Sequence, residues 1–361
     1  MRWGVYWFLF VASLKMFVRN RAALFFSLIV PLLIMLIFGV LNFGGGTSIS
    51  LGLVDEAHSD GSRALVAAID ANKTFKVQAG AQQLELAELK EGHRDLVLVI
   101  PAGYQLAPPS AGAPGLLAYT NAARPEQAQL GGLVLNALVG QLVAGGGAGA
   151  GAPLVAVTVL PGRDLGYIDF LVPGMLGLTV MQLGLFSVAF GFVQLKRTGA
   201  LRRLFATPTS PAYFLGAQVT SRVLIALAQV LILLGVGLWF GLQLVGSVFL
   251  LLAISILGSI IFLALGFSIA GWAKNEDQAA PVANLVSLPM TFLSGVFFSR
   301  DAMPDFLRTV TDFLPLTYLN DALRRVTNDG VGVSAIGGDL LGMAVWAVIA
   351  FGLAVFLFRW E

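Results

Sequence analysis

One stretch of this chain constrains its fold more than any other. Residues 223–273 contain no Asp, Glu, Lys or Arg in 51 consecutive positions. About a quarter of the residues of an average soluble domain are charged, whereas 12% of this chain is charged and 57% is hydrophobic. An apolar helix crosses the hydrocarbon core of a bilayer in about 20 residues. The stretch therefore predicts two consecutive membrane-spanning helices, with a turn at 240–246 ("FGLQLVG").

The predicted fold class is an α-helical polytopic membrane protein with six transmembrane helices. Four further apolar segments supply the other spans, and Pro281 and Pro289 should break or kink the fifth of the six. Between the first two spans, β-rich runs such as "DLVLVIP" and "LVAVTVL" alternate with helical stretches. This alternation indicates an inserted α/β or α+β extracytoplasmic domain, with a Gly/Ala-rich tether at 144–153 near its end.

These segments set the expected organisation of the chain. It comprises an amphipathic N-terminal helix at 1–21, a first span at 22–43, an extracytoplasmic α/β domain at 44–165, a second span at 166–195, a cytoplasmic helix at 196–209, spans at 210–240, 246–273 and 278–299, a segment of extracytoplasmic re-entrant or short helices at 300–336, and a sixth span at 337–359. The N-terminal helix is expected to be retained, because cations interrupt its apolar run and no cleavage pattern follows.

Orientation is predicted from the cations in short loops, which face the cytoplasm. Three cations precede the first span and four lie between the second and third, so both termini are expected in the cytoplasm and the domain at 44–165 outside. The loop at 300–336 is then external although it carries four Arg, which is the observation against this orientation. We expect a multi-pass protein of the cell (inner) membrane. The seven cations are Lys15, Arg19, Arg21, Lys196, Arg197, Arg202 and Arg203.

The basic segment at 196–211, "KRTGALRRLFATPTSP", is predicted to form a short helix. Thr198 can cap this helix, and Leu201, Leu204 and Phe205 share one face at helical spacing. Pro208 prevents the helix from continuing. From these residues alone, the helix either rests on lipid headgroups as a basic loop or contacts another protein.

The chain resembles the permeases of ABC-2-type transporters at three places. Residues 197–216 are similar to a family loop that reads Gly-Thr-Leu-Glu-Arg-Leu, two apolar residues, then Thr-Pro. "FLVPGMLGL" at 170–178 is similar to the apolar-Pro-Gly run of the second span, and 281–324 is similar to the fifth span and the Pro-, Tyr- and Arg-containing segment after it. The loop positions that match are Gly199, Leu201, Arg203, Leu204, Thr207 and Pro208.

This resemblance implies that the basic segment is a coupling helix that docks on a separate ATP-hydrolysing subunit. It also implies that Trp3–Arg19 is an interfacial connecting helix that lies flat on the membrane. The family often has acids at the positions of Arg197 and Arg202, so the partner surface is expected to be more acidic than usual. The implied contact residues are Thr198, Gly199, Leu201, Arg202, Arg203, Leu204, Phe205, Thr207 and Pro208.

The sequence contains no phosphate-binding GxxxxGK loop, because none of its six Lys follows a Gly. No catalytic, cofactor or metal site is expected in this chain, and ATP with Mg would be bound by the partner subunit. Coupling to an ion gradient normally requires ionisable residues deep in the spans. Arg222 is the only deep candidate, either snorkelling to the cytoplasmic face or pairing with Glu276 or Asp277.

Two stretches contain residue types that bind metals or catalyse reactions. "DEAHSD" at 55–60 follows an expected strand and precedes an expected helix, so we interpret it as a solvated turn in which Ser59 or Asp60 caps the helix. His93 in "EGHRD" is interpreted as a surface residue. Neither stretch supports a catalytic assignment.

We therefore expect the permease subunit of an ATP-binding-cassette exporter that moves hydrophobic or amphipathic, drug- or lipid-like compounds out of the cell. It would work in the lipid bilayer with ABC ATPase subunits and a second permease chain, identical or paralogous, and without nucleic acid. Spans two and five would line the route, where Pro173, Gly174, Pro289 and Gly295 allow close packing and kinks. The alternatives are a non-transporting receptor or scaffold whose external domain binds a ligand, and a gradient-driven secondary transporter.

Overall fold

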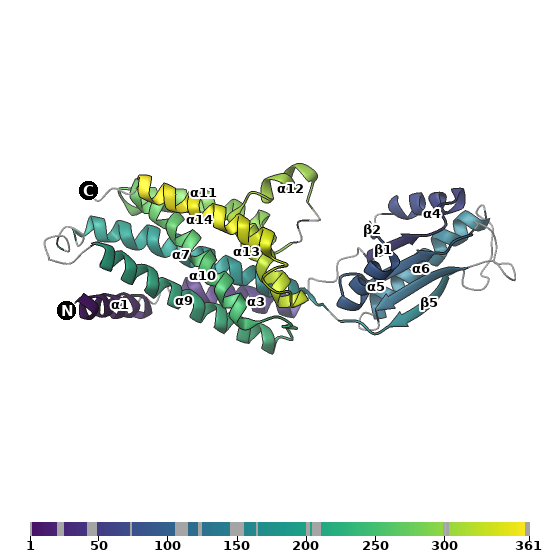
Figure 1. Ribbon diagram of the computed structural model, residues 1–361, viewed down its shortest axis with the longest axis horizontal. Helices are drawn as coiled ribbons and strands as arrows, with labels where there is room; N and C mark the ends of the chain where they lie inside the picture. The colour runs from purple at the N-terminus through teal and green to yellow at the C-terminus, as the bar shows by residue number, and fades with distance from the viewer. Residues whose placement is uncertain are drawn as a thin grey trace. The chain divides into compact units, whose positions relative to one another are not determined.

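The computed structural model describes residues 2–19, 25–41, 49–72, 74–104, 115–121, 125–144, 155–163, 165–199, 203, 211–298, 300 and 303–357. The chain forms two compact units, Phe43–Gly166 on the one hand and Met1–Asn42 with Tyr167–Glu361 on the other (Figure 1). The first unit combines a sheet with helices, and the second is helical.

The helical unit is a bundle of long apolar helices with shorter helices between them (Figure 1). Its described elements are α1 (Arg2–Arg19), η1 (Phe25–Ile29), α3 (Val30–Leu41), α7 (Tyr167–Arg197), α9 (Pro211–Trp239), α10 (Val248–Trp272), α11 (Glu276–Leu293), α12 (Asp305–Thr311), α13 (Pro315–Arg324), η3 (Arg325–Asp329) and α14 (Gly337–Leu357).

Among the described residues, four helices are long and apolar enough to cross a membrane. They lie at the predicted second, third, fourth and sixth spans. The predicted first span contains η1 and α3, in which Ser27–Ile37 is a shorter apolar helix, and the predicted fifth span corresponds to α11. It stays a prediction that the first and fifth of these predicted spans also cross the membrane. The four long helices are Tyr167–Arg197, Tyr213–Trp239, Val248–Trp272 and Gly337–Leu357.

Helix α7 holds the bundle together, because it packs against α3, α9, α10, α11 and α13. Glycines let it approach α10 closely. A Cβ atom on Gly184 would lie 2.6 Å from the Cβ of Phe262, and one on Gly266 would lie 2.7 Å from the carbonyl oxygen of Gly184. Small residues at such crossings are the usual means of close helix packing in membranes.

Helix α1 runs beside α9 (Figure 1). The hydroxyl of Tyr6 lies 2.7 Å from Oγ1 of Thr220, and further along both helices Phe17 packs against a cluster that includes Ile225. The residues expected to form the N-terminal connecting helix are thus helical and follow the direction of α9. Their position flat on a membrane surface stays a prediction.

The second unit contains a five-stranded sheet in the order β2-β1-β3-β4-β5. All neighbouring strands are parallel except β3 and β4, which are antiparallel. Strands β3 and β5 lie at the predicted β-rich runs "DLVLVIP" and "LVAVTVL". The extracytoplasmic position of this unit stays a prediction. The elements are β1 (Ile49–Asp55), α4 (Asp60–Asp70), β2 (Phe75–Ala79), α5 (Gln82–Glu91), β3 (Leu96–Ile100), β4 (Leu116–Asn121), α6 (Pro125–Ala144) and β5 (Val155–Leu160).

Helices cover both faces of this sheet. All five residues of β3 are buried, and because successive side chains of a strand point to opposite faces, this strand contributes to two cores. Leu96 and Leu98 pack in the core that includes Leu65 of α4 and Leu135 of α6. Val97 and Val99 face the smaller core formed with α5. Strands buried on both faces are typical of parallel sheets with crossover helices.

Candidate functional site

Helices α7 and α11, which were predicted to line the translocation route, come into contact in the structure. Helix α7 and the turn after α11 meet where Gly174 contacts the backbone of Val296. A Cβ on Gly174 would lie 2.6 Å from the Val296 carbonyl oxygen and 3.0 Å from its Cα, so this contact requires glycine. Gly295, the neighbour of Val296, has a φ of +70°, which favours glycine as well. We call this contact the Gly174–Val296 seam.

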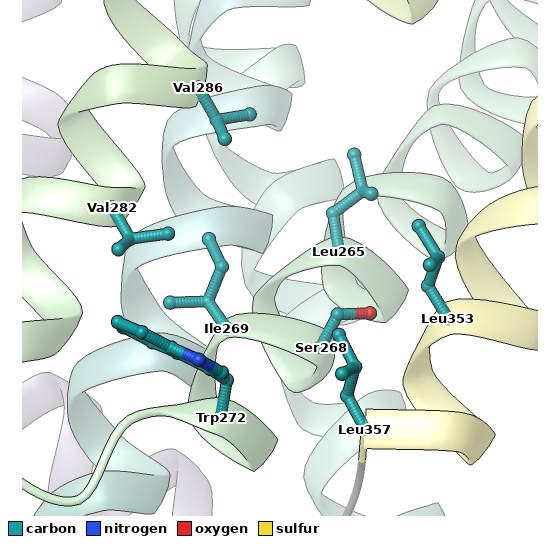
Figure 2. A pocket seen from close by; sticks show the side chains of 8 residues that line it. All are labelled: Leu265, Ser268, Ile269, Trp272, Val282, Val286, Leu353 and Leu357. Carbon is teal, nitrogen blue, oxygen red and sulfur yellow. The ribbon is translucent and has the colours of Figure 1, made fainter.

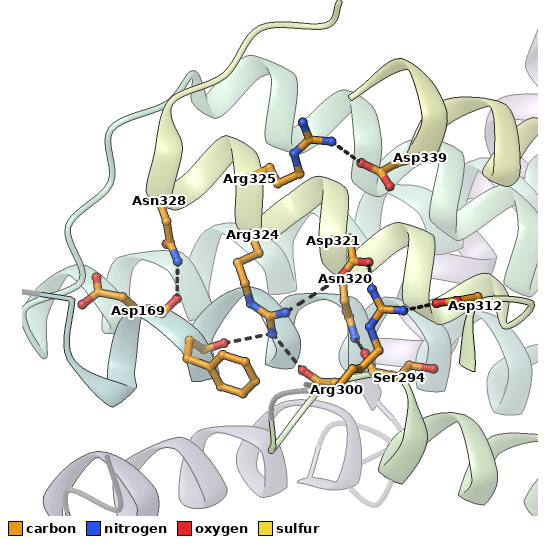
Figure 3. Close-up of polar contacts among 12 residues, drawn as sticks. Asp169, Ser294, Arg300, Asp312, Asn320, Asp321, Arg324, Arg325, Asn328 and Asp339 are labelled. Carbon is orange, nitrogen blue, oxygen red and sulfur yellow. Dashed lines mark hydrogen bonds and ion pairs between the residues drawn. The ribbon is translucent and has the colours of Figure 1, made fainter. Parts of the chain in front are cut away.

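Side chains of α13 donate hydrogen bonds to backbone carbonyl oxygens of the turn at this seam (Figure 3). Nη2 of Arg324 donates to the carbonyl oxygens of Gly295 at 2.8 Å and Phe170 at 3.4 Å. The Arg324 guanidinium also lies 4.0 Å from the centre of the Phe170 ring. One turn earlier, Nδ2 of Asn320 donates to the carbonyl oxygen of Ser294 at 3.0 Å. We call these five residues the Arg324 cluster.

Further polar contacts tie the same region to the ends of α7 and α14 (Figure 3). Nδ2 of Asn328 donates to the Asp169 carbonyl oxygen at 3.0 Å. Nη1 of Arg325 lies 3.1 Å from Oδ2 of Asp339. Arg300 forms ion pairs with Asp312 at 2.7 Å and with Asp321.

Of the predicted route residues, the structure brings Gly174 and Gly295 to the seam. Pro173 is buried within α7 next to Gly174. Pro289 lies on the exposed face of α11 and is not part of the seam.

Sequence reasoning missed Asn320 and Arg324, the latter having been counted only as a loop cation. A signal was present, because Thr317, Asn320 and Arg324 recur every three or four residues and so share one helix face. Thr317 and Asn320 are buried to 2% and 0% exposure. A buried polar face on a short helix of a membrane protein indicates a specific polar interaction.

A second feature of the bundle is an apolar pocket of about 210 Å³ between α10, α11 and α14 (Figure 2). Among the described lining residues only Ser268 carries a hydroxyl, and this hydroxyl donates to the Ala264 carbonyl oxygen. The described walls therefore present mainly hydrocarbon and an indole ring. Such a pocket suits an acyl chain or an aromatic group. Its lining residues are Leu265, Ser268, Ile269, Trp272, Val282, Val286, Leu353 and Leu357.

Arg222 of α9 points toward α7. Its Nε donates to Oγ of Ser187 at 3.0 Å and Nη2 to the Ser187 carbonyl oxygen at 3.1 Å, and Nη1 contacts the side-chain oxygen of Gln218. Within the part of the chain that the structure describes, no carboxylate pairs with this guanidinium. The predicted pairing with Glu276 or Asp277 is therefore wrong, because neutral acceptors on α7 and α9 satisfy the charge instead.

The sequence of residues 21–356 matches the family model described as ABC-2 family transporter protein. The chain belongs to this family. It is 25% identical over 204 residues to ABC transporter G family member 20 of Dictyostelium discoideum, 25% over 196 residues to the inner membrane transport permease YadH of Escherichia coli, and 28% over 195 residues to the probable multidrug ABC transporter permease YbhS of Escherichia coli.

These matches cover 56%, 54% and 51% of this chain and 28%, 74% and 49% of the respective relatives. The chain thus spans about a quarter of the Dictyostelium protein and half of YbhS. Family membership and the four long apolar helices identify the chain as a membrane protein of the ABC-2 transporter family.

In this ABC-2 permease the predicted coupling segment follows α7. Gly199 has a φ of +65° and ends the helix, and the hydroxyl of Thr198 donates back to the Gln194 carbonyl oxygen at 3.0 Å. Thr198 therefore lies in the last turn of α7, and the amides that it was predicted to cap belong to residues 200–202, which lie outside the described residues. Nη2 of Arg203 donates to the Thr198 carbonyl oxygen at 2.9 Å. The other predicted contact residues, Leu201, Arg202, Leu204, Phe205, Thr207 and Pro208, lie outside the described residues.

Proposed function

We propose that this permease exports hydrophobic or amphipathic, drug- or lipid-like compounds, driven by ATP hydrolysis in a separate ABC subunit. The observation that carries the proposal is the Gly174–Val296 seam. A permease has to open and close a path between its helices. At the seam, α7 and the turn after α11 are held together by a few directional contacts. Charge-assisted hydrogen bonds such as those of Arg324 fix the relative positions of the groups that they join. Exchanging these hydrogen bonds for others would allow α7 and the turn after α11 to separate.

The end of α7 offers a way for a partner to act on this seam. Nζ of Lys196 donates to the Ala270 carbonyl oxygen at 3.0 Å, which ties the end of α7 to the end of α10. The Arg203 side chain contacts the Thr198 carbonyl oxygen. A force on residues 196–209 would therefore reach α7 and α10 together, and α7 continues as one helix to Gly174. The sequence resemblance and the absence of a GxxxxGK loop support an external ATPase as the source of that force.

The pocket between α10, α11 and α14 supports an apolar substrate class. Its walls offer dispersion and hydrophobic contact, and none of the described residues that line it is charged. Burying a hydrocarbon group there releases about 25 cal/mol per Å² of apolar surface. A substrate with an acyl or aromatic portion fits these walls better than a hydrophilic ion.

The proposal is tested by co-reconstitution with the cognate ATPase and measurement of ATP-dependent efflux of a fluorescent lipid or drug. Leu204→Asp should abolish co-purification with the ATPase and the efflux. Leu84→Asp is the control, because Leu84 is 57% exposed on α5 of the other unit. Efflux at the wild-type rate in Leu204→Asp would refute the coupling assignment.

A receptor or scaffold is the second candidate, and one observation favours it. The unit Phe43–Gly166 has its own core and exposes Leu133 of α6 and Val159 of β5 to 62% and 63%. Exposed apolar residues are candidates for contact with a ligand or partner. Binding of an external ligand without any ATP-dependent flux would support this candidate over the exporter.

A further inference from the structure

Three potential metal ligands converge at the end of α5. Glu88 and Glu91 lie one turn apart on this helix, and His93 follows it. Gly92 ends the helix with a φ of +86°, and the His93 amide donates to the Glu88 carbonyl oxygen at 2.9 Å. This turn brings the imidazole back over the two carboxylates.

The distances among these groups suit a small divalent ion. Nδ1 of His93 lies 3.0 Å from Oε2 of Glu88 and 3.9 Å from Oε2 of Glu91, and all three ligand atoms lie within 4.8 Å of one another. A tetrahedral Zn²⁺ with ligands at about 2.1 Å separates them by about 3.4 Å. These two distances lie on either side of this value, so small side-chain rotations would complete the geometry, with the ion replacing the hydrogen bond between His93 and Glu88.

The surroundings of the three groups favour a cation. The backbone carbonyls at the C-terminal end of α5 carry partial negative charge, and two carboxylates add to it. The nearby Arg94 is committed elsewhere, because its Nε donates to Glu85 at 2.8 Å and a second nitrogen contacts Gln78. Nη1 of Arg94 also forms a longer ion pair with Oε2 of Glu88 at 3.9 Å, which a bound ion would have to replace.

The solvent exposure of the three groups and their ligand types also agree with a Zn²⁺ site. The side chains of His93, Glu88 and Glu91 are 30%, 29% and 55% exposed, so water can reach the ion and complete its coordination. The chain contains no Cys and only two His, so imidazole is its best ligand for a transition metal. One imidazole with two carboxylates suits Zn²⁺, whereas Ca²⁺ and Mg²⁺ prefer oxygen ligands alone.

The other His provides an internal contrast. His58 also lies in an acidic stretch, "DEAHSD". There, Oδ1 of Asp55 accepts from the His58 and Ala57 amides and Oδ2 accepts from Ser62, so this carboxylate serves the turn. Among the described residues, only the group at the end of α5 brings three such ligands together.

We propose that Glu88, Glu91 and His93 form a Zn²⁺ site that fastens the end of α5 to the start of β3. The test is zinc titration of the purified full-length chain in detergent, without a histidine tag, by competition with a chromophoric chelator. We expect one Zn²⁺ per chain. His93→Gln and Glu91→Gln should each weaken binding by at least about tenfold, since loss of an outer-shell partner alone costs about 10–100-fold.

The matched control is His58→Asn, which removes the other imidazole and should leave the affinity unchanged. Zn²⁺ should also slow hydrogen exchange in the last turn of α5, and Glu91→Gln should remove that effect without unfolding, because Glu91 is largely exposed. The proposal is overturned if the wild-type chain binds no Zn²⁺, if His58→Asn weakens binding as much as His93→Gln, or if excess Ca²⁺ displaces the ion and His93→Gln has no effect.

Discussion

Nη2 of Arg324 donates a 2.8 Å hydrogen bond to the carbonyl oxygen of Gly295, 29 positions earlier in the chain. The same nitrogen reaches the Phe170 carbonyl oxygen, so one side chain of α13 joins the start of α7 to the turn after α11. This relationship connects the best-defined polar contacts of the bundle to the helices that were expected to line the route.

Arg324→Met should loosen this turn. The substitution keeps an apolar stem but removes charge-assisted hydrogen bonds worth about 1.5–3 kcal/mol and a contact between the cation and the Phe170 ring. Hydrogen exchange of residues 294–297 should rise. Arg325→Met is the control, because Arg325 is 43% exposed in its pair with Asp339 and such pairs contribute about 0–1 kcal/mol. Equal exchange in the two variants would contradict the role given to Arg324.

Gly174→Ala and Gly235→Ala should change stability in opposite directions. Alanine within a helix is more favourable than glycine by about 0.5–1 kcal/mol, and a Cβ on Gly235 meets no atom within 4 Å. At Gly174 the Cβ would overlap the Val296 carbonyl, and such overpacking costs about 1–3 kcal/mol. Thermal unfolding in detergent should therefore show a higher midpoint for Gly235→Ala and a lower one for Gly174→Ala. A stabilised Gly174→Ala variant would show that the seam is not tight.

The sequence predicted the long spans well because uncharged runs of 20 or more residues leave few alternatives. It also located the strands, since runs such as 96–100 are β-branched or apolar throughout. It could not predict the Arg324 cluster, because the acceptors there are backbone carbonyls of Ser294, Gly295 and Phe170, and a carbonyl carries no sequence signature. His93 was interpreted as a surface residue, and its side chain is 30% exposed. Its approach to Glu88 could not be predicted, because it depends on the left-handed backbone at Gly92.

Acid should weaken the turn that precedes α4. Burial acts to raise the pKa of Asp55, but hydrogen bonds from Ser62 and from the amides of His58 and Ala57 outweigh it and hold the pKa below its ordinary value. The stabilisation is therefore present above the unfolded-state pKa of about 3.9 and is lost as the pH falls through the lower folded-state value.

The amides of α4 should accordingly lose protection below pH 4, after correction for intrinsic exchange rates. Asp55→Asn should remove most of this pH dependence. Asp60→Asn serves as the control, because the Asp60 side chain is 98% exposed and should leave the pH dependence intact. Protection that falls equally with pH in wild type and Asp55→Asn would assign the effect to other groups.

Filling the apolar pocket should impair transport of apolar substrates. Val286→Phe adds a ring on the pocket wall, so a substrate group that binds there would be displaced and KM should rise several-fold. Leu288→Phe places the same ring on the face of α11 where Leu288 is 54% exposed. If both variants transport with unchanged KM, the pocket does not bind substrate.

Orientation can be tested directly because the chain contains no Cys, so single cysteines report without background. Ala156 is exposed on β5, and Thr198 is exposed at the end of α7. With cations facing the cytoplasm, a membrane-impermeant maleimide should label Ala156→Cys in intact cells and Thr198→Cys only after permeabilisation. Loss of the Thr198 hydroxyl should cost little, because its acceptor is a carbonyl within the same exposed turn. Labelling of Thr198→Cys in intact cells would place the basic segment outside and rule out its contact with a cytoplasmic ATPase.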